Sequence, residues 1–126
     1  MRRKIKVLII DDEKDFGLFL KMNMESTGRY KVFLATTGPE GIKLTHRKKP
    51  NVIVLDIRMP DMDGFEVLDQ IKGNTKSFTI PVIMLTALDT GDSRFRAMGS
   101  FVKEYVVKPV ELEELISVID RVLLFG

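Results

Sequence analysis

Short apolar runs alternate with amphipathic stretches five times along this chain, and this alternation restricts the fold more than any other feature. The runs are rich in β-branched residues and nearly continuous, as strands buried on both faces of a sheet are. They cover residues 5–10, 30–35, 51–56, 80–86 and 105–107. The second run is expected to be an edge strand of the sheet.

The amphipathic stretches predict five helices. They cover residues 13–27, 39–47, 64–72, 89–98 and 112–124, with Gly28 placed to end the first helix. Strands that alternate with helices imply a parallel sheet covered on both sides. With right-handed crossovers, the expected fold is a doubly wound α/β sandwich. The length of 126 residues suits one domain.

Polar side chains follow four of the five predicted strands. Asp11 and Asp12 come after the first strand, Asp56 ends the third, Thr86 ends the fourth and Lys108 follows the fifth. Ligands of a doubly wound sheet bind at this edge. Clustered carboxylates suit Mg²⁺, and an ammonium group and a hydroxyl suit phosphoryl oxygens. A carboxylate in this setting can act as a nucleophile and form an acyl phosphate. The spacing leaves open whether Asp12 or Asp56 has this role.

A family resemblance decides between these two acids. The loop that carries it reads Asp56-Ile57-Arg58-Met59-Pro60-Asp61-Met62-Asp63-Gly64. This string resembles the phosphoacceptor loop of bacterial response-regulator receiver domains. The likeness extends to Asp11-Asp12, Thr86-Ala87 and Lys108-Pro109, and it covers essentially the whole chain. It implies a single receiver domain over residues 1–126, like the chemotaxis regulators. The expected fold is then a flavodoxin-like sandwich with strand order 2-1-3-4-5.

The resemblance also implies roles for individual residues. Asp56 would accept a phosphoryl group from a sensor histidine kinase or a histidine phosphotransfer protein. Asp11, Asp12 and Asp56, with the backbone carbonyl of Arg58, would hold Mg²⁺ or Mn²⁺. Lys108 would pair with the phosphoryl group, and we expect the peptide bond that follows it, to proline, to be cis.

The conformational response and the contact surfaces are implied in the same way. Thr86 would move toward the phosphoryl group, and Tyr105 would turn inward to fill the vacated space, as a shift between two populations. Leu18 and Met22 lie four residues apart on the first helix and are expected to form part of the docking patch for the donor protein. A phosphorylation-dependent dimer would use the fourth helix, the fifth strand and the fifth helix.

Two segments depart from the usual pattern of the family. Gly99 and Ser100 come earlier than the family's Gly-Ala pair, which leaves the end of the fourth helix and the surface beside Tyr105 open. Arg58 and Leu88 occupy positions that tune the lifetime of the phosphoryl group in the family. The sequence does not give the sign of their effect.

Composition and charge restrict location and partners. No apolar run approaches the roughly 18 residues needed to cross a membrane. The basic start runs into three acids, so we expect no signal peptide. Without any Cys, a cytoplasmic location fits. A net charge of +2 gives no reason to expect nucleic-acid binding. Four apolar residues are expected in or near the core: Phe16, Phe19, Leu20 and Val110.

Three other functions compete with that of a phosphoacceptor that is not itself an enzyme. A metal-dependent aspartyl-phosphate phosphatase needs a second acid and a cap over its pocket, and no insertion is long enough for a cap. A nucleotide-binding domain needs a Gly-rich phosphate loop, and neither G-x-x-x-x-G-K-[ST] nor G-x-G-x-x-G occurs. A receiver fold that acts only by contact would not need all five site residues. The donor, the output and the presence of further domains stay open.

Overall fold

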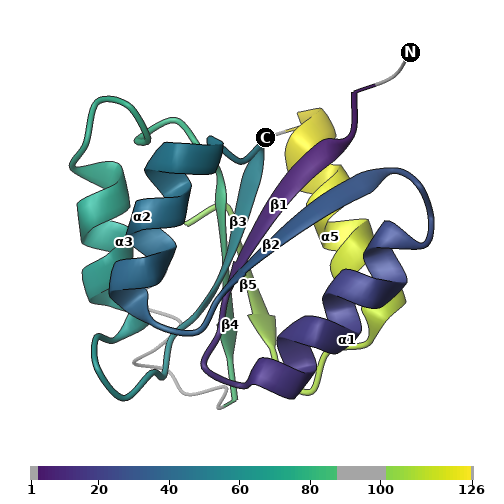
Figure 1. Cartoon of the computed structure of the whole chain (residues 1–126), viewed down its shortest axis with the longest axis horizontal. Coiled ribbons are helices and arrows are strands. Elements are labelled where there is room, and N and C mark those ends of the chain that lie inside the picture. Colours follow the sequence, from purple (N-terminus) through teal and green to yellow (C-terminus); the bar gives the residue numbers. More distant parts are fainter. Residues whose placement is uncertain (1–2, 88–101, 126) are drawn as a thin grey trace.

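Five parallel strands form one sheet in the computed structural model, which describes residues 3–87 and 102–125. The strands are β1 (Ile5–Ile10), β2 (Tyr30–Ala35), β3 (Val52–Asp56), β4 (Val82–Thr86) and β5 (Glu104–Val107). Their order is β2-β1-β3-β4-β5, so β2 is an edge strand as predicted (Figure 1). The doubly wound α/β fold and its strand order are therefore confirmed.

Four helices are described, and they cover both faces of the sheet. They are α1 (Lys14–Glu25), α2 (Gly38–Lys48), α3 (Gly64–Lys72) and α5 (Leu112–Phe125). Figure 1 shows α1 and α5 on one side of the sheet and α2 and α3 on the other. The predicted helix over residues 89–98 lies outside the described residues, as do Leu88, Gly99 and Ser100. None of the described helices is both long and apolar enough to span a membrane.

Successive residues of the inner strands supply two separate cores. Ile9 and Val54 pack with α1 and α5, whereas Ile10 and Leu55 pack with α2 and α3. Side chains alternate between the faces of a strand, so a strand covered on both sides is apolar at every position. This is why the sequence shows continuous apolar runs at β1, β3 and β4 instead of an apolar–polar alternation.

Two local expectations for α1 are wrong. The helix ends at Glu25 with Ser26 as its cap, so Gly28 does not cap it. Gly28 instead takes a left-handed conformation (φ 81°) in the following turn, which glycine adopts without strain. Phe19 was expected near the core, but 53% of it is exposed. Leu20 and Met24 are the fully buried residues of this helix, and Phe19 lies on a different face.

The loop between β3 and α3 is tightly packed against the end of β3. Asp63 begins the helix, since its carboxylate accepts hydrogen bonds from the backbone N–H groups of Phe65 (2.8 Å) and Glu66 (3.0 Å). The N–H of Gly64 donates to the carbonyl of Ile57 at 2.7 Å. A side chain at position 64 would begin 2.4 Å from the carbonyl oxygen of Asp56. Glycine therefore lets α3 start directly beside the last residue of β3.

We expect Gly64→Ala to destabilise the fold by about 1–3 kcal/mol, because the added methyl group meets backbone atoms that cannot rotate away. The measurement is the free energy of unfolding in urea. Gly17→Ala is the control, since its methyl group would first meet the end of the Leu34 side chain at 3.3 Å. Equal free energies for the two variants would show that the β3–α3 loop is not tightly restrained.

Candidate functional site

The carboxyl ends of four strands place their polar residues at one edge of the sheet. The backbone N–H of Asp11 donates a hydrogen bond to the carbonyl oxygen of Ala35 at 3.0 Å. The backbone N–H of Lys108 donates one to the carbonyl oxygen of Thr86. In the strand pairs, Asp56 lies opposite Leu85, and Thr86 lies opposite Val107. Hydrogen bonding of the parallel strands thus fixes these four backbone positions relative to one another.

Three carboxylates meet at this edge. Asp11, Asp12 and Asp56 each offer an oxygen within 4.8 Å of the oxygens of the other two. Asp11 and Asp56 are almost completely buried, whereas Asp12 is exposed. Three carboxylate oxygens around one point, with one side open to solvent, form a donor set that suits a hard divalent cation that keeps part of its water shell. The fold therefore brings together the three acids that the sequence predicted.

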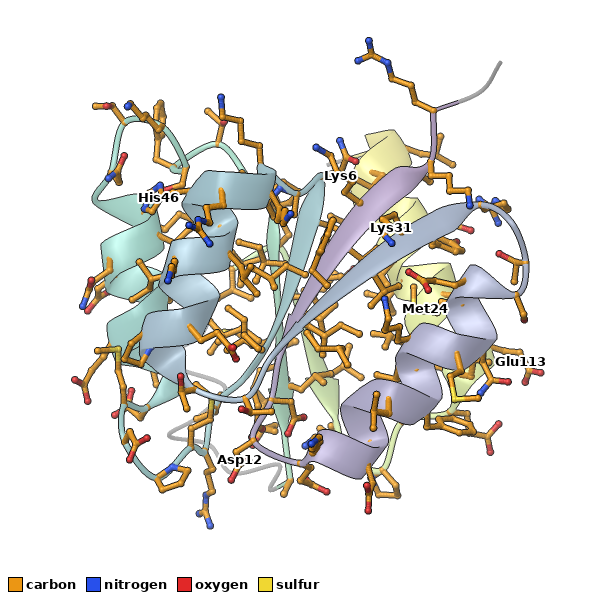
Figure 2. All side chains as sticks on the ribbon, viewed as in Figure 1. Lys6, Asp12, Met24, Lys31, His46 and Glu113 are labelled. Carbon is orange, nitrogen blue, oxygen red and sulfur yellow. The ribbon has the colours of Figure 1, made fainter. Side chains whose placement is uncertain are left out.

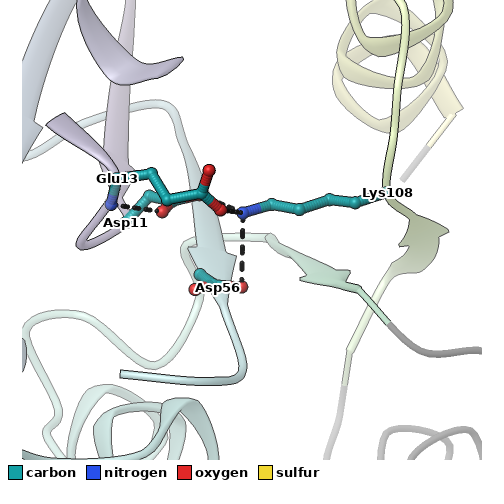
Figure 3. Close-up of polar contacts among 4 residues, drawn as sticks. All are labelled: Asp11, Glu13, Asp56 and Lys108. Atoms are coloured by element: carbon teal, nitrogen blue, oxygen red, sulfur yellow. Dashed lines mark hydrogen bonds and ion pairs between the residues drawn. The ribbon is translucent and has the colours of Figure 1, made fainter. Parts of the chain in front are cut away.

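Lys108 reaches across the site from the end of β5 (Figure 3). Its Nζ lies 2.7 Å from Oδ2 of Asp11, 2.8 Å from Oε1 of Glu13 and 3.7 Å from Oδ1 of Asp56. It also lies 4.9 Å from the centre of the Phe16 ring, within cation–π range. The peptide bond between Lys108 and Pro109 is cis, as predicted. The ammonium group is thus the counter-ion of the buried acids.

Glu13 and Phe16 were not predicted as members of the site. The sequence pattern places Glu13 among the three acids at the start of the first helix, and Phe16 in or near the core. The adjacent acids Asp11-Asp12-Glu13 were the one available signal for Glu13. Nothing in the sequence pointed to Phe16, because its contact with Lys108 depends on how α1 is turned against the sheet.

Burial and crowding perturb the ionisation of the acids. The pKa of Asp56 is raised to about 7, mainly by burial and further by the negative charge of Asp11. The positive charge of Lys108 opposes this rise. Burial also raises the pKa of Asp11, although its hydrogen bond with Lys108 opposes the shift. For Lys108, burial would lower the pKa, but its hydrogen bonds to Asp11 and Glu13 raise it overall. Additional positive charge at this point would favour the ionised carboxylates.

A hollow of about 540 Å³ lies beside the acids. It is lined by Asp12, Ile57, Arg58, Met59, Pro60, Asp63 and Phe65. The hollow is open enough for a reacting group to approach Asp12 from solvent, and the exposed Arg58 side chain lies at its wall. Asp63 is fixed as the cap of α3, so it is not a further free carboxylate of the site.

The structure also locates the residues that are expected to change conformation on phosphorylation and those that are expected to contact the donor protein. Thr86 is buried at the end of β4, and Tyr105 is half-buried and packs with the α2/α3 core. Leu18 and Met22 are exposed on α1, by 38% and 71%. Their expected roles, and that of the Arg58 carbonyl, remain predictions.

Comparison with known proteins gives a consistent result. The family described as response regulator receiver domain matches residues 7–120. The probable transcriptional regulator ycf27 of Galdieria sulphuraria is 39% identical over 123 residues, which are 98% of this chain and 47% of that protein. The chain spans about half the length of the curated relatives it matches.

Two solved structures have the same architecture. The receiver domain of the Francisella response regulator 1452 is 31% identical, with a TM-score of 0.85 over 95% of this chain and 97% of that one. The chemotaxis protein CheY4 of Vibrio cholerae is 26% identical, with a TM-score of 0.90 over 96% of this chain and 100% of that one.

We expect Asp12→Asn to weaken Mg²⁺ binding at least about tenfold, because even loss of an outer partner of a metal ligand has this effect. Without metal, the variant should be at least as thermally stable as the wild type, since one repelling charge is gone. The measurement is the melting temperature with and without Mg²⁺. Asp15→Asn, which removes an exposed acid of α1 outside the cluster, is the control. A full Mg²⁺-dependent rise in Asp12→Asn would exclude Asp12 as a ligand.

Proposed function

Because the chain belongs to the response regulator receiver domain family, we propose that Asp56 accepts a phosphoryl group from a phosphohistidine donor in a Mg²⁺-dependent reaction. The supporting observation is the position of Asp56 at the centre of the site. Its carboxylate lies within 4.8 Å of two further carboxylates and 3.7 Å from an ammonium group. Asp11 lies nearer to Lys108, at 2.7 Å, so the choice of Asp56 over the other two acids rests on the family likeness of the loop that it begins.

In the proposed reaction, an oxygen of Asp56 attacks the phosphorus atom as the bond from phosphorus to the donor imidazole breaks. The imidazole leaves with the electron pair of that bond and takes up a proton. Asp11 and Asp12 would hold Mg²⁺ together with Asp56 and the Arg58 carbonyl. A bound Mg²⁺ would neutralise charge on the carboxylates and the phosphoryl oxygens. Ionised Asp56 is the reactive form, so any cation that lowers its raised pKa favours the reaction.

Lys108 has a second part in this proposal. Its ammonium group is now shared among Asp11, Glu13 and Asp56, with the longest distance to Asp56. A phosphoryl group on Asp56 adds oxygens on that side, which would draw Lys108 toward position 56. Thr86, one strand away, would offer its hydroxyl to another phosphoryl oxygen. Tyr105 would then move inward, and the change would be passed to a partner or an attached domain.

The output and the location go beyond the domain itself. The curated relatives with twice the length of this chain are probable transcriptional regulators. Control of transcription is therefore the output that we propose where this domain forms part of a longer chain. A sensor histidine kinase or a histidine phosphotransfer protein is the proposed donor, and the cytoplasm is the proposed location.

Incubation with acetyl phosphate and Mg²⁺ should add one phosphoryl group to the wild-type protein and none to Asp56→Ala. The measurement is intact mass with and without Mg²⁺, followed by hydroxylamine, which should remove the group because an acyl phosphate is labile. Asp61→Ala, a neighbouring exposed acid, should still be modified. Modification of Asp56→Ala would refute the assignment. A wild-type protein that stays unmodified even with a histidine kinase would favour a domain that acts by contact alone.

We further propose that Leu18 and Met22 form part of the docking patch for the donor protein. Both are exposed on α1, and the exposed Phe19 lies next to Leu18. The helix begins at Lys14, immediately after the acids of the site. A cluster of exposed apolar side chains of this kind is typical of a contact surface. A donor bound there would lie beside the open side of the carboxylate cluster.

Leu18→Lys should lower the rate of phosphotransfer from a cognate histidine kinase by about tenfold, as loss of one central apolar contact does. The same variant should react with acetyl phosphate at the wild-type rate, because its acids are unchanged. Leu124→Lys, which makes the same change at an exposed apolar position in the last turn of α5, is the control. An unchanged rate from the kinase would exclude Leu18 from the patch.

A further inference from the structure

The end of the molecule opposite the acids carries a group of lysines that lie outside the ion pairs of the described residues. They lie in or beside the amino ends of strands and in the last turns and following loops of helices. These are Lys4, Lys6, Lys31, Lys48, Lys49, Lys72, Lys76 and Lys103. None of them forms an ion pair with another residue in the described ranges 3–87 and 102–125. Figure 2 shows Lys6 and Lys31 toward this end and Asp12 at the other.

Helix dipoles account for only part of this group. Lys48 and Lys72 lie in last helical turns, where cations are favoured. Lys6, Lys31 and Lys103 lie in or just before strands, where no such preference exists. The positive charge of this end therefore needs a further explanation.

Two of these lysines share a groove with apolar walls. The groove has a volume of about 570 Å³ and lies between the α3–β4 loop, the start of β5 and the end of α5. Its apolar lining includes Phe78, Val102 and Leu123, and its charged lining is Lys72 and Lys103. Phe78 is 52% exposed although it is a large apolar residue. The groove has the size of a site that takes a few side chains, not a folded domain.

The Lys72 ammonium group is held in position by the protein. Its Nζ donates to the carbonyl oxygens of Phe78 at 3.1 Å and Ile80 at 2.7 Å. Burial lowers the pKa of Lys72, and the charge of Lys103 lowers it further. Among the described residues, no carboxylate lines this groove beside the two ammonium groups. An anionic group placed between them would relieve their repulsion.

We propose that this groove binds an extended acidic segment of a partner protein, in which carboxylates alternate with apolar side chains. The carboxylates would pair with Lys72 and Lys103, and the apolar side chains would pack against Phe78, Val102 and Leu123. Charge complementarity fixes the orientation of such a segment, and burial of its apolar residues stabilises it. A nucleic-acid backbone would match the lysines but would leave the apolar walls uncovered. A concave groove likewise does not suit insertion into a membrane surface.

This proposal is independent of phosphoryl transfer. The groove lies at the amino ends of β4 and β5, whereas the acids lie at the carboxyl ends of the strands. A partner bound in the groove would therefore leave Asp12 and Asp56 accessible. One domain would then be able to hold a partner at one end while it is modified at the other.

The test is fluorescence anisotropy of a labelled peptide in which aspartate alternates with leucine and phenylalanine. We expect saturable binding by the full chain, and at least about tenfold weaker binding by Lys103→Glu and by Phe78→Ser. Both positions are exposed, so both variants should fold, which a urea titration checks. Lys43→Glu makes the same charge change at an exposed position of α2 and should alter the affinity less than about twofold. Asp56→Ala should bind as the wild type does.

Comparison probes separate this proposal from other anionic partners. Polyglutamate and single-stranded DNA should bind at least about tenfold more weakly than the peptide, because neither fills the apolar walls. Equal or tighter binding of DNA, or tight binding to phosphatidylserine vesicles, would overturn the proposal in favour of a general anion-binding face. Absence of peptide binding, or no effect of Phe78→Ser, would overturn it as well.

Discussion

The ion pair between Lys108 and Asp11, at 2.7 Å, is the interaction on which the site depends. Both side chains are removed from water, and a buried carboxylate without a partner is strongly destabilising. Lys108 compensates Asp11 and Glu13 directly and Asp56 at a longer distance. It also joins the end of β5 to the end of β1, which are not neighbours in the sheet. One ammonium group thus holds the acids at a separation that suits a divalent cation.

The parallel sheet gives the two ends of the molecule opposite chemistry. The described helices begin at the edge of the sheet where the strands end. Acids at this edge therefore lie near the positive ends of helix dipoles. Asp15, Glu40 and Glu66 lie in the first turns of α1, α2 and α3. Lysines that form no ion pair with another described residue collect at the other end. The direction of the chain therefore separates a cation-binding edge from a basic one.

Helix α1 combines two tasks on different faces. Its first turns contribute Phe16 to the surroundings of Lys108, and its buried residues Leu20 and Met24 fix it to the sheet. Leu18 and Met22 remain exposed within about three turns of the acids. A protein that contacts Leu18 would lie near the proposed phosphoryl acceptor. The position of α1 thus places the proposed docking surface near the acidic site.

Local patterns in the sequence were sufficient for the strands, for α3 and for the meeting of Asp11, Asp12 and Asp56, because periodicity and strand direction are properties of short segments. Strand order and the choice of Asp56 as acceptor needed a family likeness. Tertiary structure alone decided the contact of Lys108 with Glu13, which are 95 residues apart, and the exposure of Phe19. It also decided the meeting of Lys72 with Lys103 in one groove. These features depend on how a helix is turned and on which distant segments pack together, and long-range packing leaves no periodic trace in a sequence.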